Sequence, residues 1–408
     1  MAYYDEVIDR LQWFVMDIQR TGMLIDQPLV ARYLELAESN KTKLKASFEK
    51  ALGYPYNPNA PQQTLALFNN DFMIPIEGTT ELELLKATLD KPEAMPVVEG
   101  ILQYKDMIKK SGTYLKPVVW ADNRVRSQFR LYGTLTWRLS SRDPDLQNLP
   151  RAASLGINIK DIYISPPGYS LIEIDYSALE DRIPAYASGA TKLIQMFARG
   201  ENTHLYRASI IFNRPITDKK KQAKEYDFAK RLRYATGYRA GLPKISDKLL
   251  EDMHEWHPPE EIGPMIRRLE SDMPEITAWQ DACWKECEKT NLLYDGFNTP
   301  RILYSAKHER RQVACSWPTQ TTASGIMNRA MVRIYDAIRA GRFYATTRCV
   351  CQVHDSLLFE ILDAHVESET RKLVELMEVP VRVFDQDVVF PVEAKSGKRW
   401  GSMETLRL

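Results

Sequence analysis

The sequence lacks the features of several protein classes. No run approaches the 18 consecutive apolar residues of a membrane-spanning helix, and the acidic start has no apolar core typical of a signal peptide. Only five cysteines occur, without a CxxC pair, so we expect reduced thiols and a cytoplasmic protein (host cytoplasm if it is viral) that has no membrane partner. Cys283 and Cys287, one helical turn apart, leave zinc open as an alternative. The formal net charge is +1, so any surface that binds nucleic acid must be local.

Apolar spacing and turn residues predict an α+β protein. Helices are expected at 4–19, 28–51 and 93–110, through much of 200–342 with a break at 257–261, and at 366–378. Short strands are expected between 117 and 175, around residue 355 and at the end of the chain. Because the strand-rich parts are far apart in sequence, the catalytic sheet should be discontinuous.

Two aspartates at the ends of apolar, strand-like runs carry the strongest chemical signal. Asp175 follows the run 171–174, and Asp355 follows the run 350–353. Strands that bring two carboxylates to one point can hold two Mg²⁺ ions about 4 Å apart, which serve phosphoryl transfer. The backbone carbonyl of Tyr176 is a further ligand, and Mn²⁺ can substitute for Mg²⁺. Each aspartate alone could instead cap a turn; together they predict a template-directed nucleotide polymerase.

A basic, aromatic segment at 219–239 is predicted to be one helix. Lys230, Tyr234 and Tyr238 stand at i, i+4 and i+8, roughly on one face. A lysine there can pair with a triphosphate, while two rings offer stacking surface for a base. The alternative is a solvated basic helix with two tyrosines in a core.

These segments resemble the polymerase domain of family A DNA polymerases, the bacterial DNA polymerase I group and its phage relatives. Residues 175–182 (DYSALEDR) resemble motif A, and residues 353–355 (VHD) resemble motif C. Residues 133–150 (GTLTWRLSSRDPDLQNLP) resemble the long signature TGRLSSxDPNLQNIP. Further matches are residues 318–323 with the PxQGTAA helix, and residues 17–26 and 56–59 with the thumb. The resemblance runs from about residue 5 to Trp400.

The resemblance implies a right-hand fold with a helical thumb, an antiparallel-sheet palm and helical fingers. The thumb is expected at 1–116, the palm at 117–200 and 343–408, and the fingers at 201–342. The implied reaction is addition of dNTPs to a primer 3′-OH on primer–template DNA, by a monomer. The exonuclease and 5′ nuclease domains common in the family are not expected, so a separate exonuclease or helicase would be a partner. A minimal phage- or viral-type enzyme and an excised fragment remain open.

The resemblance also implies roles for individual residues. Asp175 and Asp355 would be catalytic metal ligands, and Glu180 would exclude a ribose 2′-OH. Lys230 would bind the triphosphate and is the better candidate to protonate pyrophosphate, with His354 as the alternative. Tyr234 and Tyr238 would lie under the incoming nucleotide, and His204 would contact its outer phosphates. The residues expected to contact DNA are Arg138, Gln147, Asn148, Ser316, Gln320 and His354 near the primer end, and Asn57, Asn59, Lys105, Lys109, Lys110 and Lys116 along the duplex. The alternatives are polar loops that satisfy one another and lysines that are plain surface.

Three positions depart from the family pattern. Tyr226 stands where the family has an arginine, Arg239 where it has a glycine, and Ser356 where it has a glutamate. Phosphate neutralisation could instead fall to Lys219, Lys220, Lys224 or Arg233, and the sequence does not choose. Two rival functions are a single-subunit RNA polymerase and a catalytically silent DNA-binding subunit. Glu180 argues against the first, and the intact Asp175, Asp355 and Lys230 argue against the second.

Overall fold

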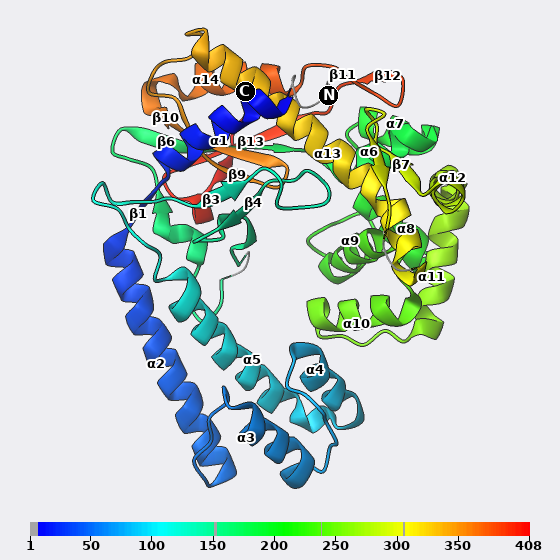
Figure 1. The fold of residues 1–408 in the computed structure, drawn as a ribbon. Helices are drawn as coiled ribbons and strands as arrows, with labels where there is room; N and C mark the ends of the chain where they lie inside the picture. The colour runs from blue at the N-terminus through cyan, green and yellow to red at the C-terminus, as the bar shows by residue number, and fades with distance from the viewer. Residues whose placement is uncertain (1–6, 151–152, 238, 305–306) are drawn as a thin grey trace.

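The structure is a computed structural model that describes residues 7–150, 153–237, 239–304 and 307–408. A five-stranded antiparallel sheet, called the central sheet below, lies in the upper left part of Figure 1. The strand order is β14-β13-β6-β10-β9. The strands are β6 (Tyr169–Tyr176), β9 (Arg348–Val353), β10 (Ser356–Leu362), β13 (Val392–Gly397) and β14 (Glu404–Thr405). β6 pairs on both sides with strands from the far end of the chain, so the sheet is discontinuous in sequence, as predicted.

Helices pack on the sheet, and residues on both of its faces are buried. α1 (Asp9–Thr21) packs on β9, and α14 (Val366–Met377) packs on β6 and β13. The long helix α13 (Lys307–Arg339) contacts both α1 and α14. The consecutive residues Leu171 and Ile172 of β6 are both fully buried, although successive strand residues point to opposite faces. The continuous apolar run that predicted this strand is therefore explained by burial on both faces.

A helical arm extends away from the sheet (Figure 1). It consists of α2 (Gln27–Leu52), α3 (Pro61–Ala66), α4 (Glu81–Asp90) and α5 (Met95–Lys109), with the π-helical turns Leu67–Asp71 and Lys110–Tyr114. The carboxylate of Asp26 accepts from the backbone N of Leu29 at the start of α2, and Gly53 ends that helix with φ +78°. A separate apolar core holds the tip together, so the arm has its own packing unit.

A second helical region faces this arm across the molecule (Figure 1). α6 (Leu179–Ser188) and α7 (Thr191–Ala198) lead away from the sheet to α8 (Thr203–Phe212), α9 (Ala223–Gly237), α10 (Leu242–Met253), α11 (Pro259–Asp272) and α12 (Pro274–Thr290). α10 touches α4 of the arm, where Lys86 Nζ lies 2.7 Å from Asp247 Oδ1 and Leu250 enters the core of the arm tip. The two helical regions therefore meet at their tips.

Small sheets connect these parts. They are formed by β1 (Met23–Ile25) with β2 (Arg124–Val125) and β5 (Tyr163–Ile164), β3 (Gln128–Arg130) with β4 (Ser140–Arg142), β7 (Leu292–Tyr294) with β8 (Pro300–Ile302), and β11 (Val381–Val383) with β12 (Gln386–Val388). Short 3-10 turns complete the chain at Pro92–Ala94, Leu146–Asn148, Ile159–Ile162, Asp363–His365 and Trp400–Ser402. Within the described ranges, the structure holds no helix with the length and apolar character needed to cross a bilayer.

The predicted α+β architecture is confirmed, with local differences. The helix expected at 219–239 begins only at Ala223, because the Asp218 carboxylate accepts from the backbone N of Lys220 and Lys221 and forms a turn before it. The hairpin β7–β8 interrupts a region expected to be helical. The division into thumb, palm and fingers stays a prediction, although α1, assigned to the thumb, packs on the central sheet.

Candidate active site

The two aspartates lie side by side at one end of the central sheet. In the register of β6 and β10, Asp175 is paired with Ser356, and the backbone N of Tyr176 donates to the carbonyl of Asp355 at 3.1 Å. His354 and Asp355 form the two-residue turn between β9 and β10, with His354 at φ +52°. A turn this short needs a residue with positive φ, and histidine is among the side chains that tolerate one. The turn therefore presents Asp355 next to Asp175.

The electrostatics of this pair favour a bound cation. Burial, together with the like charge of Asp355 and then of Glu173, raises the pKa of Asp175 to about 7. Burial raises the pKa of Asp355 to about 6, although the positive charge of Arg138 opposes the shift. No described residue donates a hydrogen bond to the buried Oδ1 of Asp355. Two carboxylates that are costly to ionise, one with an unsatisfied oxygen, fit a site for divalent cations.

Arg138 and Glu180 border the aspartates. Arg138 Nη2 binds the carboxylate of Glu180 and lies 3.9 Å from Asp355 Oδ1. Glu180 is in the first turn of α6, directly after the strand that carries Asp175. The structure thus brings the predicted DNA-contacting arginine and the predicted sugar-excluding glutamate together beside the two aspartates.

The side chains expected around a triphosphate gather on α8 and α9. The rings of His204 and Tyr226 meet edge to face with centroids 5.7 Å apart, and Lys219 Nζ lies 4.8 Å above the Tyr226 ring. Burial lowers the pKa of His204 to about 4, helped by the charges of Arg207, Arg233 and Lys230 and opposed by Asp181. The imidazole is therefore neutral at pH 7. Lys230 and Tyr234 lie on the same helix, and Tyr238 is outside the described residues.

Arg239, which replaces the family's glycine, ties the end of α9 to two neighbouring helices. Its guanidinium lies 2.5 Å from Glu270 of α11 and 3.5 Å from Asp281 of α12. Its φ of +49° is in the left-handed region, which costs an arginine more than a glycine. The two ion pairs hold the Arg239 side chain while its backbone adopts a conformation that favours glycine.

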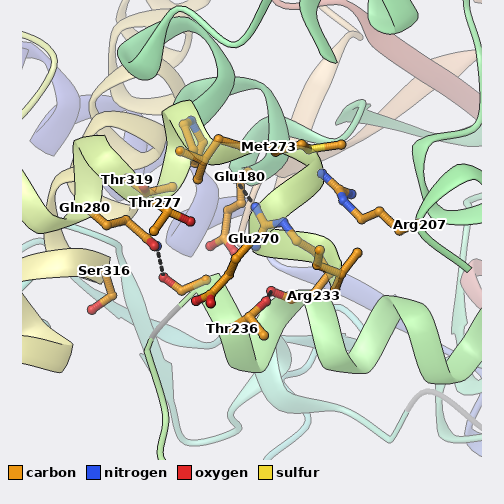
Figure 2. A pocket seen from close by; sticks show the side chains of 14 residues that line it. Glu180, Arg207, Arg233, Thr236, Glu270, Met273, Thr277, Gln280, Ser316 and Thr319 are labelled. Atoms are coloured by element: carbon orange, nitrogen blue, oxygen red, sulfur yellow. Dashed lines mark hydrogen bonds between the residues drawn. The ribbon is translucent and has the colours of Figure 1, made fainter. Parts of the chain in front are cut away.

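A pocket with a cavity volume of about 80 Å³ lies between α6, α8, α9, α11, α12 and α13 (Figure 2). Glu180, Arg207 and Arg233 form part of its wall, and Gln280, Ser316 and Thr319 line it from α12 and α13. The amide of Gln280 donates to the carbonyl of Gly237 at 3.0 Å. Through Glu180, the pocket adjoins the arginine that lies next to Asp355.

Among the other predicted DNA contacts, Gln147 shows the clearest structural role. It is 7% exposed, and its amide donates to Gln352 Oε1 at 2.7 Å. In this structure Gln147 therefore matches the alternative expectation, in which polar groups form hydrogen bonds with one another. Gln352 in turn donates to the carbonyl of His354, which supports the turn that carries Asp355. Asn148 is bound to Asp145 at 2.7 Å, and Ser316 and Gln320 are half-buried on α13.

The lysines expected along the duplex fall into different environments. Lys110 is 1% exposed and pairs with Asp106 at 2.9 Å, so the expectation that it grips DNA is wrong. Lys105 is half-buried and donates to the carbonyl of Thr79 at 2.6 Å. Lys109 is exposed, 5.9 Å from the Tyr114 ring centroid. Asn57, Asn59 and Lys116 are also exposed, so they and Lys109 stay predictions as DNA contacts.

Sequence reasoning missed three charged residues near the site. Asp181 and Arg207 are buried next to Glu180 and His204, and Glu393 lies opposite Asp175 on β13. A single charged residue usually lies on a solvated face, so its presence in the sequence does not indicate a buried role. The only signal for Asp181 was its position directly after Glu180. The only signal for Glu393 was the alternation of apolar and polar residues along β13.

Comparison with known proteins decides the family. The model of DNA polymerase family A matches residues 28–402. The chain belongs to DNA polymerase family A. This confirms the resemblance read from the motifs.

Several bacterial polymerases show the extent of the similarity. The chain is 29% identical to a thermostable DNA polymerase I of Thermus thermophilus over 97% of its own length and 48% of the relative. It is 27% identical to the DNA polymerase I of Caldicellulosiruptor bescii, with 97% of the chain and 47% of the relative covered. The chain spans about half the length of these curated relatives.

A solved structure confirms the fold. The POL domain of Pol1 from M. smegmatis, determined in complex with DNA primer-template and dNTP, matches with a TM-score of 0.85 over 97% of this chain and 70% of that one. The identity is 21%, so this match speaks for the fold alone.

Proposed function

We propose that the chain is a template-directed DNA polymerase that adds dNTPs to a primer 3′-OH. The observation that carries the proposal is the β6–β10 register, which presents Asp175 beside Asp355 in a member of family A. In this proposal α2–α5 form the thumb, the central sheet the palm and α8–α12 the fingers, and the enzyme acts as a monomer on primer–template DNA. Primer extension with dNTPs, with rNTPs and with an Asp175→Ala control tests it.

Asp175, Asp355 and the Tyr176 carbonyl would hold two Mg²⁺ ions. When bound, these ions would supply charge stabilisation for the attacking and leaving oxygens in phosphoryl transfer. Lys230 pairs with the triphosphate and donates a proton to the departing pyrophosphate. The neutral His204 imidazole donates a hydrogen bond to an outer phosphate, and Tyr234 offers its ring to the base.

Lys219 is the best candidate to replace the arginine that is missing at Tyr226. Its ammonium lies over the Tyr226 ring, which in turn contacts His204. Two of the three competing cations are engaged elsewhere: Lys224 lies 2.5 Å from Glu255, and Arg233 lies 2.6 Å from Asp181. The third, Lys220, is exposed. Tyr226 therefore serves as a platform that holds a lysine where the family holds a guanidinium.

Glu180 separates the proposed function from its RNA polymerase rival. We expect Glu180→Ala to lower the ratio of kcat/KM for dNTP over rNTP, because the shorter side chain opens space beside the sugar C2′. Glu180→Gln is the matched control: it keeps the side-chain length but removes the charge that pairs with Arg138. Its ratio should stay close to that of the unmodified chain. An unchanged ratio in Glu180→Ala would mean that Glu180 does not exclude the 2′-OH.

Tyr234 should determine how the enzyme treats dideoxynucleotides. The phenol OH can supply a hydrogen bond to phosphate that the missing 3′-OH of a terminator no longer makes, whereas a phenyl ring cannot. Such a bond is worth roughly 1.5–3 kcal/mol, or about one to two powers of ten in relative incorporation. The unmodified chain should accept dideoxynucleotides readily, and Tyr234→Phe should reject them with little change for dNTPs. Competition between ddNTP and dNTP in single-nucleotide extension measures this, and strong rejection by the unmodified chain would contradict it.

A further inference from the structure

Three charged side chains with little exposure, those of Asp181, Arg207 and Arg233, form a cluster next to Glu180. Asp181 is 5% and Arg207 3% exposed, and the Arg233 side chain is 15% exposed. Arg207 Nη1 lies 2.6 Å from Asp181 Oδ2, and Arg233 Nε lies 2.6 Å from Asp181 Oδ1. Removing three charges from water is costly, and well-packed apolar side chains often give equal or greater stability. Stability alone is therefore a weak explanation for this cluster.

Each member of the cluster belongs to a different helix and adjoins a residue of the proposed nucleotide site. Asp181 of α6 follows Glu180, Arg207 of α8 comes one turn after His204, and Arg233 of α9 precedes Tyr234. The shared carboxylate of Asp181 thus ties together three elements that carry nucleotide contacts. The cluster fixes where these helices stand relative to one another.

Arg233 also makes a direct bond to the residue proposed to exclude the 2′-OH. Its Nη2 donates to the backbone carbonyl of Glu180 at 2.9 Å, and Figure 2 shows its side chain pointing toward Glu180. Nε and Nη2 belong to one rigid, planar guanidinium, so the ion pair with Asp181 restricts where Nη2 can donate to Glu180. The Glu180 side chain continues the chain of contacts to Arg138.

We infer that Arg233, held in place by Asp181 and Arg207, is a positioning residue that sets the discrimination between dNTPs and rNTPs. Holding the Glu180 carbonyl fixes the backbone from which its side chain projects toward the sugar. A displacement on the order of 1 Å is enough to change reactivity in a preorganised site. This inference rests on the proposed polymerase function and on the role of Glu180 in it.

The inference differs from a direct phosphate contact by Arg233. A phosphate contact would bind dNTP and rNTP alike, so its loss would weaken both and leave their ratio unchanged. A positioning role through Glu180 changes the ratio itself. The ratio is therefore the decisive measurement.

The experiment compares Arg233→Met with Arg233→Lys and with Arg231→Met in the full chain. Arg231 is a matched control on the same helix, because its guanidinium donates to the carbonyl of Asp252 at 3.1 Å. Single-nucleotide extension gives kcat/KM for a dNTP and for the matching rNTP. We expect the dNTP/rNTP ratio to fall at least about tenfold in Arg233→Met, as for loss of one charged hydrogen bond, to fall less in Arg233→Lys, and to stay unchanged in Arg231→Met.

A double-mutant cycle with Glu180→Ala tests whether Arg233 acts through Glu180. In that background Arg233→Met should lower the ratio no further, because the side chain that it positions is gone. If Arg233→Met does not fold, the combination of Asp181→Leu, Arg207→Met and Arg233→Met removes the charges together and undergoes the same measurements.

The outcomes distinguish a failure of the proposed polymerase function from a failure of the inference about Arg233. An unmodified chain that extends no primer would overturn the proposed function and this inference with it. An unmodified chain that extends primers, with an unchanged ratio in Arg233→Met, would overturn the inference alone. The same holds if Arg233→Met and Glu180→Ala lower the ratio independently.

Discussion

Replacing Asp175 or Asp355 with alanine should abolish primer extension. Each carboxylate is a proposed metal ligand, and losing one ligand of a two-metal site removes several kcal/mol of transition-state stabilisation. Since each 1.4 kcal/mol is about tenfold in rate, we expect residual extension below about one percent. Primer–template affinity should change little, because the lost interaction acts on the chemical step.

Asp363→Ala is a suitable control for this result. Asp363 lies at the opposite end of the same two strands, where its carboxylate accepts from the Ser170 hydroxyl and pairs with the exposed Lys398. Its loss removes a surface ion pair and leaves Asp175 and Asp355 untouched, so near-normal extension is expected. Extension rates and DNA dissociation constants for the three variants check the prediction. More than about one percent activity in Asp175→Ala or Asp355→Ala would remove that residue from the catalytic site.

The aspartate pair could be predicted because its signal is local. Each aspartate follows an apolar run, and the β6–β10 ladder then joins the two runs in antiparallel register. The end of α2 at Gly53 was equally readable, since a left-handed terminal residue favours glycine. Family motifs supplied what the local pattern could not, namely which distant segments meet.

Other features depend on contacts that leave no trace in a short stretch of sequence. Lys109 and Lys110 are neighbours, yet one is exposed and the other is buried against Asp106. Gln147 is part of a family motif, but its amide donates to Gln352, which in turn supports the turn that holds Asp355. The hairpin β7–β8 consists of three-residue strands, too short for an alternating pattern. In each case long-range packing decides the environment.

The cluster of Asp181, Arg207 and Arg233 at the proposed nucleotide site also depends on long-range packing and could not be predicted from the sequence. A carboxylate after Glu180 and arginines on two helices are typical of solvated faces, and only the fold buries them together. Its members come from α6, α8 and α9. The cluster therefore has to be found in the structure.

Asp181→Asn should produce a large loss of stability. The variant leaves Arg207 and Arg233 without the carboxylate that both contact, and an uncompensated buried charge costs about 3–5 kcal/mol. For a chain of 408 residues this corresponds to a fall in Tm of about 4–6 °C. Asp336→Asn, which breaks the exposed pair with Arg10, is the control and should change Tm by less than about 1 °C.

The pH dependence of this loss identifies its cause. Burial alone would raise the pKa of Asp181, but the charges of Arg207 and Arg233 hold it below its ordinary value. A carboxylate with a lowered folded pKa contributes its full stability above its unfolded pKa of about 3.9, and the contribution is lost as pH falls through the folded pKa. The difference in Tm between the unmodified chain and Asp181→Asn should therefore be constant from pH 8 to pH 5. Thermal unfolding across that range measures it, and a difference that vanishes between pH 7 and pH 5 would mean that Asp181 is not held as a carboxylate between the two arginines.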